Sequence, residues 1–125
     1  MLVKFVGLAM AGAVGTLFRV GLSSLAAHWL PRHPFWGTVS VNVLGSFLYG
    51  LVWALSVHHR WLSPELRLVV LGGFMGAFTT FSTYVFDTVQ LSDNSGLRAA
   101  ATYFALQNLI AFACLWAGVA LGRSG

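Results

Sequence analysis

A polar stripe crosses the second long apolar stretch of the chain. Thr38, Asn42 and Ser46 stand four residues apart, which places them on one face of a helix. The amide of Asn42 offers two N–H donors and one acceptor, a combination that suits a partly dehydrated anion and adds no charge of its own. Hydrogen bonding between helices is the other role open to this stripe, and it fits Thr38 and Ser46 better than Asn42.

The third apolar stretch is unusually rich in small and hydroxyl-bearing residues. Residues 72–84 contain three glycines and four serines or threonines. Glycine and β-branched threonine weaken a helix, and a break at membrane depth persists only where the freed backbone groups find protein, water or ions. We therefore expect the third helix to be broken near its middle, with exposed carbonyls of the kind that bind a small cation.

Two aromatic rings stand in the same stretch. Phe81 and Tyr84 are three residues apart and share a helix face, an arrangement that core packing alone also explains. Because an aromatic ring has a positive edge, rings presented edge-on beside hydroxyls and an amide can line a path for an anion. No charged side chain within residues 72–84 would attract a cation.

The elements that must position these residues are membrane helices. Of the 125 residues, 58% are hydrophobic and 8% are charged, against about 25% charged in soluble domains, so a water-soluble surface cannot be built. A helix needs about 20 apolar residues to cross a bilayer. We expect an all-α integral membrane protein, a single domain over residues 1–125, with spans at about 4–29, 35–58, 65–89 and 97–122.

The first span differs from the others because it contains Arg19. A charged residue well inside a membrane helix costs roughly 3 kcal/mol on insertion scales, so Arg19 needs water, a partner, or a position from which it reaches the lipid headgroups. A cleaved secretory leader is the alternative for this segment, since Lys4 precedes an apolar run and small residues follow. Three further spans, and an apolar run that continues beyond Arg19, favour a retained helix.

Short polar connections link the spans. Ser63 and Pro64 have the composition of a helix start, and residues 90–96 have that of a turn. With four spans, both termini and the second connection share one side of the membrane. The cationic side chains then divide four to two: Lys4, Arg60, Arg67 and Arg123 against Arg32 and Arg98. Positive residues near span ends set orientation, and so small a difference leaves both orientations open.

Several other function classes find little support. The three carboxylates, Glu65, Asp87 and Asp93, stand at or near span ends, and no histidines or cysteines have metal-ligand spacing, so an enzyme is not expected. The seven Lys and Arg residues are scattered, which favours membrane lipids over nucleic acid as the partner. Small residues four apart, such as Gly118 and Gly122, favour tight packing and oligomerisation.

Three segments together resemble the Fluc (CrcB) family of fluoride channels. They are residues 12–19 (Gly-Ala-Val-Gly-Thr-Leu-Phe-Arg), 37–47 (Gly-Thr-Val-Ser-Val-Asn-Val-Leu-Gly-Ser-Phe) and 79–83 (Thr-Thr-Phe-Ser-Thr). The likeness covers essentially the whole chain, and residues 79–83 are its most specific part. It implies a multi-pass protein of the bacterial cell membrane that lets cytoplasmic fluoride leave passively and so reduces fluoride toxicity.

The same resemblance implies an assembly and a metal ion. The assembly is an antiparallel, dual-topology homodimer with two separate fluoride pathways. A structural sodium ion, which is not transported, lies at its centre and is held by the backbone carbonyls of Gly76 and Thr79 from both copies. The undecided division of charge along this chain agrees with dual topology.

The resemblance also assigns the fluoride pathway. Its residues are Thr38, Asn42, Phe81, Ser82, Tyr84, Tyr103 and Gln107, with Arg19 near the vestibule, where a cation raises the local concentration of anions. Tyr84 stands where relatives carry phenylalanine, so its hydroxyl either donates to the ion or plugs the path. Gln107 stands where serine is common, either as a longer donor or as a contact between helices. Asn108 is expected to face another direction.

The main alternative is a small four-helix proton-coupled multidrug exporter, which can also insert both ways. Such proteins need a carboxylate deep in the first span, and residues 4–29 contain none. A scaffold subunit without transport activity would account for the close-packing glycines, but not for the polar and aromatic faces together. We therefore expect a fluoride channel.

Overall fold

The computed structural model describes residues 1–31 and 35–124, and the regular structure within these ranges is helical. Four helical segments are long and apolar enough to cross a membrane, as predicted: Leu2–Trp29, Trp36–His58, Pro64–Ser95 and Leu97–Ser124. The first, second and fourth are the continuous helices α1, α2 and α6. Arg32, one of the two cations predicted for the far side, lies outside the described residues.

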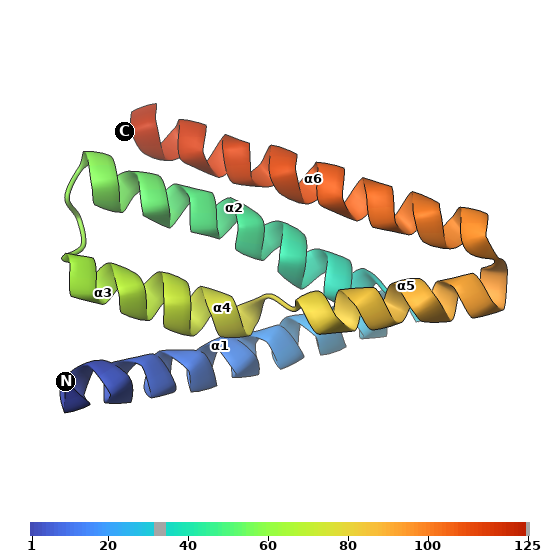
Figure 1. The fold of residues 1–125 in the computed structure, drawn as a ribbon, viewed down its shortest axis with the longest axis horizontal. Coiled ribbons are helices and arrows are strands. Elements are labelled where there is room, and N and C mark those ends of the chain that lie inside the picture. The colour runs from blue at the N-terminus through green and yellow to red at the C-terminus, as the bar shows by residue number, and fades with distance from the viewer. Residues whose placement is uncertain (32–34, 125) are drawn as a thin grey trace.

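The third span is divided into several pieces. It consists of α3 (Pro64–Leu68), the π-helical segment η1 (Val69–Met75), α4 (Gly76–Phe78) and α5 (Phe81–Ser95). Between α4 and α5 the backbone is extended at Thr79, with φ −81° and ψ 161°, and at Thr80, with φ −145° and ψ 111°. Figure 1 shows this interruption as a thin connection between two coiled segments. The predicted break near the middle of the third helix is therefore confirmed.

The ends of the third span agree with its sequence at one side and differ at the other. Ser63 caps the start as predicted, since its hydroxyl accepts a hydrogen bond from the amide of Leu66 at 3.2 Å. The predicted turn at residues 90–96 is wrong, because α5 remains helical to Ser95. The helix ends at Gly96, whose φ of 85° and ψ of 164° form a backbone conformation that favours glycine.

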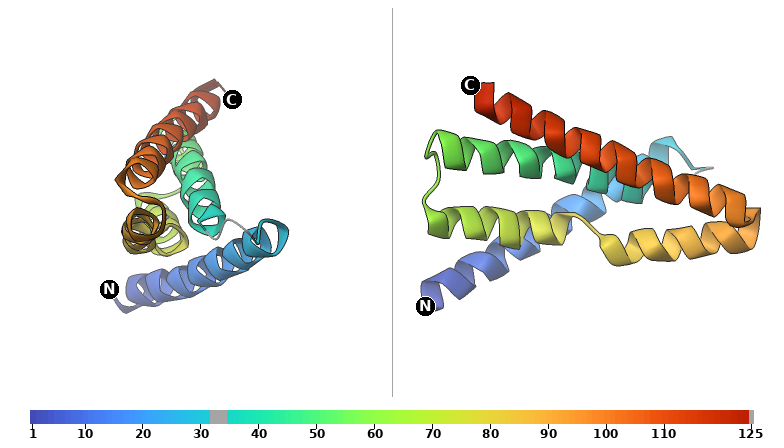
Figure 2. Two further views of the ribbon diagram at one scale, coloured as in Figure 1. Left: turned by 90° about the vertical axis from the view of Figure 1, so that its right-hand side faces the viewer. Right: turned by 45° about the horizontal axis from the view of Figure 1, so that its top comes forward.

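The helices pack as a tight pair with two further elements beside it. Helices α2 and α6 lie side by side, while α1 crosses the third span obliquely (Figures 1 and 2). Gly118 makes the α2–α6 approach possible, because a Cβ atom there would overlap the carbonyl oxygen of Phe47. Gly15 plays the same part where α1 meets Phe74 of η1. The small residues thus serve close packing within one chain.

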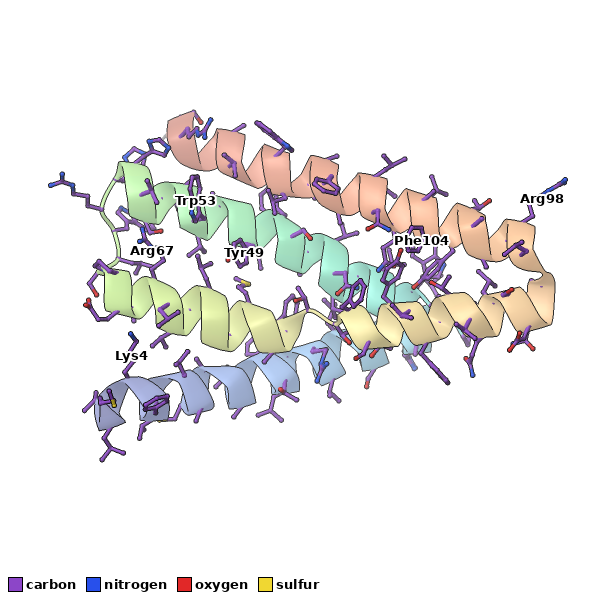
Figure 3. All side chains as sticks on the ribbon, viewed as in Figure 1. Lys4, Tyr49, Trp53, Arg67, Arg98 and Phe104 are labelled. Atoms are coloured by element: carbon purple, nitrogen blue, oxygen red, sulfur yellow. The ribbon has the colours of Figure 1, made fainter. Side chains whose placement is uncertain are left out.

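Cationic side chains lie at both ends of the bundle. The two chain termini and the α2–α3 connection lie at one end (Figure 1). Lys4 and Arg67 lie at this end and Arg98 at the opposite end (Figure 3). These three cations therefore divide between the ends as the sequence predicted.

Candidate functional site

A cavity of about 340 Å³ lies where α2 and α6 meet the interruption of the third span. We call it the central cavity. Its lining includes Asn42, Ser46, Thr79, Phe81, Tyr84 and Gln107. Four of these, Asn42, Phe81, Tyr84 and Gln107, were assigned to the fluoride pathway from the sequence, so residues up to 65 positions apart meet at one site.

Asn42 holds the interruption in place. Its Nδ2 donates to the carbonyl of Thr80 at 3.0 Å, and its Oδ1 accepts from the amide of the same residue at 2.8 Å. Since the side-chain amide carries two N–H groups, one of them is not used by this pair. Asn42 therefore stabilises the extended backbone at the break and retains a donor beside the central cavity.

The break releases backbone carbonyls from helical bonding, among them those of Gly76 and Thr79. In a regular α-helix the amides of Thr80 and Thr83 would bond to the carbonyls of Gly76 and Thr79. Here the Thr80 amide bonds to Asn42 at 2.8 Å, and the Thr83 amide bonds to the hydroxyl of Thr80 at 3.3 Å. The carbonyls that the resemblance assigned to sodium are thus among those at the break that lack their usual helical donors.

The two aromatic rings of the candidate pathway have very different surroundings. Phe81 is 76% exposed in the single chain, while Tyr84 is 3% exposed. Their ring centroids are 5.9 Å apart, with an edge-to-face angle of 60°. The Tyr84 ring also stacks on Phe104 at 5.6 Å and lies 5.7 Å from the ring of Tyr103. Tyr84 is therefore fixed on α6, and Phe81 has no comparable cover.

The hydroxyl of Tyr84 is bound to α6. It donates to the carbonyl of Phe104 at 3.1 Å and accepts from Nδ2 of Asn108. The prediction that Asn108 faces another direction is wrong, because this residue lines the central cavity. The contact was not readable from the sequence, since it depends on how α5 and α6 are rotated against each other.

Asp87 is a functional candidate that the sequence analysis missed. Its carboxylate accepts from the hydroxyl of Thr38 at 2.5 Å and from that of Tyr103 at 3.5 Å. These three side chains join α2, α5 and α6. Asp87 was placed near a span end because the third span was predicted to end at about residue 89. Its position three residues after Tyr84, on the same helical face, was the available signal.

Gln107 is buried between the central cavity and a second one. It is 5% exposed, and within the described ranges its Oε1 has no hydrogen-bond partner. The second cavity, of about 240 Å³, also borders on Trp36 and Tyr103. Gln107 thus lies between the central cavity and this second cavity, with one polar atom still available.

Four of the assigned residues lie outside the lining of the central cavity. Arg19 is partly exposed on α1, and Ser82 is exposed in the first turn of α5. Neither side chain lines the central cavity. Thr38 and Tyr103 also lie outside its lining, at the Asp87 cluster.

The chain matches known proteins over nearly its full length. Residues 6–119 match the family described as CrcB-like protein, Camphor Resistance (CrcB). A relative from Solidesulfovibrio magneticus, named fluoride-specific ion channel FluC, is 47% identical over 123 residues, which cover 98% of each chain. A protein of the same name from Nitrosococcus oceani is 41% identical and 96% of each chain is covered. The chain therefore belongs to the CrcB family.

Proposed function

We propose that this chain is a fluoride-selective ion channel that lets cytoplasmic fluoride cross the membrane passively. The observation that carries the proposal is the central cavity, where a neutral amide donor and an aromatic edge-to-face pair meet between membrane-spanning helices. Relatives that are named fluoride-specific ion channels support it. A pore requires no catalytic group, and these relatives are named as channels and not as enzymes.

The lining suits an anion that has lost part of its water. Fluoride in a bilayer needs donors that replace hydration, and the free N–H of Asn42 is one of these. The edges of Phe81 and Tyr84 carry positive partial charge and attract an anion from the side. Because these groups are neutral, they replace hydration without the tight hold of a fixed cation. Weak, successive contacts allow an ion to enter and also to leave.

The carbonyls of Gly76 and Thr79 support a structural sodium site. Small hard cations take oxygen ligands, and these two carbonyls lack their usual helical donors. Two copies related by twofold symmetry would supply four such oxygens, which would tie the breaks of both third spans together. Bound sodium would offset the partial negative charge of the carbonyls near the pathway.

Sodium would act as a fixed structural ion. Fluoride efflux from liposomes should therefore proceed without sodium movement, measured by an isotope of sodium in the same vesicles. Fluoride flux strictly coupled to sodium flux would contradict this role.

A second copy of the chain would complete the site as an antiparallel homodimer with two pathways. Phe81 belongs to the site yet is 76% exposed in the single chain, which leaves one side of the site open for a second copy to close. A single cysteine in place of Ser95, which is exposed and uncharged, in a Cys114→Ser background would report orientation without changing the charge division. Membrane-impermeant reagent added outside sealed vesicles should label about half of the chains in a dual-topology population. Labelling of all or none would contradict it.

Reconstituted liposomes provide the main test. Vesicles loaded with potassium fluoride and supplied with valinomycin should release fluoride to an external electrode, and vesicles loaded with chloride should release little. The proton-coupled exporter alternative predicts instead a flux driven by a proton gradient. Within the described residues α1 has no carboxylate to support that coupling. Absence of fluoride release from vesicles containing folded protein would sink the channel proposal.

A further inference from the structure

The Tyr84 hydroxyl belongs to a closed set of three hydrogen bonds, of which two join α5 to α6 and the third lies within α6. It donates to the Phe104 carbonyl at 3.1 Å and accepts from Nδ2 of Asn108 at 2.5 Å. The same Asn108 nitrogen donates to the Phe104 carbonyl at 2.7 Å. Figure 3 places Phe104 on the part of α6 that lies beside α5. The phenol is thus attached to the backbone of α6 at the wall of the central cavity.

Every polar hydrogen of the Tyr84 hydroxyl and the Asn108 amide already takes part in a hydrogen bond of this set. A phenol carries one hydrogen, and that of Tyr84 points to the Phe104 carbonyl. The Asn108 amide carries two, and these serve the phenol oxygen and the same carbonyl. No donor of the phenol remains for an ion in the cavity. The ring edge is then the only part of Tyr84 with positive partial charge that an anion can reach.

We infer that Asn108 is a positioning residue of the pathway, which holds the Tyr84 hydroxyl on α6 and leaves the ring edge to face fluoride. The inference rests on the proposed fluoride channel and adds a residue whose action goes through Tyr84. Asn108 lines the central cavity but contributes here by satisfying a buried oxygen, since Tyr84 is 3% exposed.

Loss of the Asn108 amide would affect conduction in two ways. The phenol oxygen would be left without its donor in a buried position, which favours movement of the ring. A hydroxyl that rotates away from Phe104 would donate to fluoride, and hydrogen bonds to an ionised acceptor are stronger than neutral ones. Both changes slow the passage of the ion, and both require the hydroxyl to be present.

The test compares Asn108→Leu in two backgrounds. In the parent chain, Asn108→Leu should lower initial fluoride efflux about tenfold, the effect of one unsatisfied buried group. In a Tyr84→Phe background, the same substitution should change efflux by less than about twofold, because no hydroxyl remains to be held. Leu109→Ala, at a neighbouring position of α6 that is 66% exposed, is the control for substitution in this helix.

Each outcome decides the matter. Equal losses in both backgrounds, or no loss in the parent, would overturn the inference and leave Asn108 as a packing residue. If Asn108→Leu fails to assemble, recovery of assembly by Tyr84→Phe would support the inference, and failure of both proteins would overturn it. A parent chain that folds but releases no fluoride would instead contradict the proposed function.

Discussion

The α2–α6 contact and the interruption of the third span join helices in opposite ways. Between α2 and α6, continuous helices approach so closely that a Cβ atom at Gly118 would overlap the Phe47 backbone. At the interruption, the helix stops and side chains take over the hydrogen bonds of its backbone, chiefly through Asn42 and Thr80. The α2–α6 contact is rigid because glycine, which has no side chain, lets the two backbones touch. The interruption becomes a polar site because side chains form the hydrogen bonds that its backbone lacks.

This difference explains where chemistry can occur in a small membrane protein. Regular helices satisfy their own backbone groups, so they offer an ion only what their side chains carry. A break exposes carbonyls and amides, but lipid cannot satisfy them. Asn42 stabilises the break, and it also lines the cavity with one N–H that the break does not use. The α2–α6 pair is the rigid frame that keeps Asn42 opposite Thr80.

The largest effect is expected from a substitution that prevents the close approach of α2 and α6. Gly118→Ala should prevent assembly or lower the stability of the folded protein by about 1–3 kcal/mol, since overpacking against backbone cannot relax through rotamers. Gly21→Ala is the matched control, because a Cβ atom at Gly21 meets nothing within 4 Å. Thermal unfolding in detergent, followed by size-exclusion chromatography, measures both. Similar stability of the two variants would mean that the α2–α6 approach is looser than described.

The next largest effect is expected from a substitution at the interruption of the third span that leaves the α2–α6 contact unchanged. Asn42→Asp should abolish fluoride passage, to below about one hundredth of the parent rate, because it replaces a donor with a charged acceptor that repels the anion. The carboxylate still accepts from the Thr80 amide, so the break and the dimer should persist. Efflux and size-exclusion chromatography are measured on the same preparation. Undiminished efflux would remove Asn42 from the pathway.

The sequence predicted features that depend on local composition. Hydropathy and length indicated four spans, and the glycines and threonines of residues 72–84 indicated the break. The helix cap at Ser63 follows from residues within one turn. Each of these features depends on the free energy of a short segment in lipid or in water, which the residues of that segment largely determine.

Features that depend on the relative rotation of helices were not predictable in the same way. The Asn42–Thr80 pair joins residues 38 positions apart. The contacts of Asp87 with Thr38 and of Asn108 with Tyr84 likewise arise only once α2, α5 and α6 are packed together. The π-helical turn of η1 and the continuation of α5 to Ser95 also depend on packing that composition does not encode. Gly76 and Thr79 stay predictions as sodium ligands.

A smaller effect is expected from a substitution that keeps the volume of the Tyr84 side chain but removes its aromatic ring. Tyr84→Ile should lower fluoride efflux about tenfold, because an aliphatic side chain fills similar space without a positive edge. It also loses the stacking contact with Phe104 at 5.6 Å, so assembly must be checked beside efflux. Normal efflux from an assembled Tyr84→Ile protein would show that the aromatic edge is not part of the pathway.

The smallest expected effect comes from Tyr84→Phe, which removes the hydroxyl and keeps the ring. The variant should retain most of the parent efflux, since the hydroxyl hydrogen already points to Phe104 and not to the cavity. Asn108 would keep its other bond to the Phe104 carbonyl at 2.7 Å, so the wall of α6 stays in place. The competing view, in which the hydroxyl donates to fluoride, predicts that Tyr84→Phe fails as badly as Tyr84→Ile. Initial efflux from both variants, at equal dimer content, decides between them. Equal losses would show that the break region conducts through a hydroxyl, and that the ring edge of Tyr84 serves only packing.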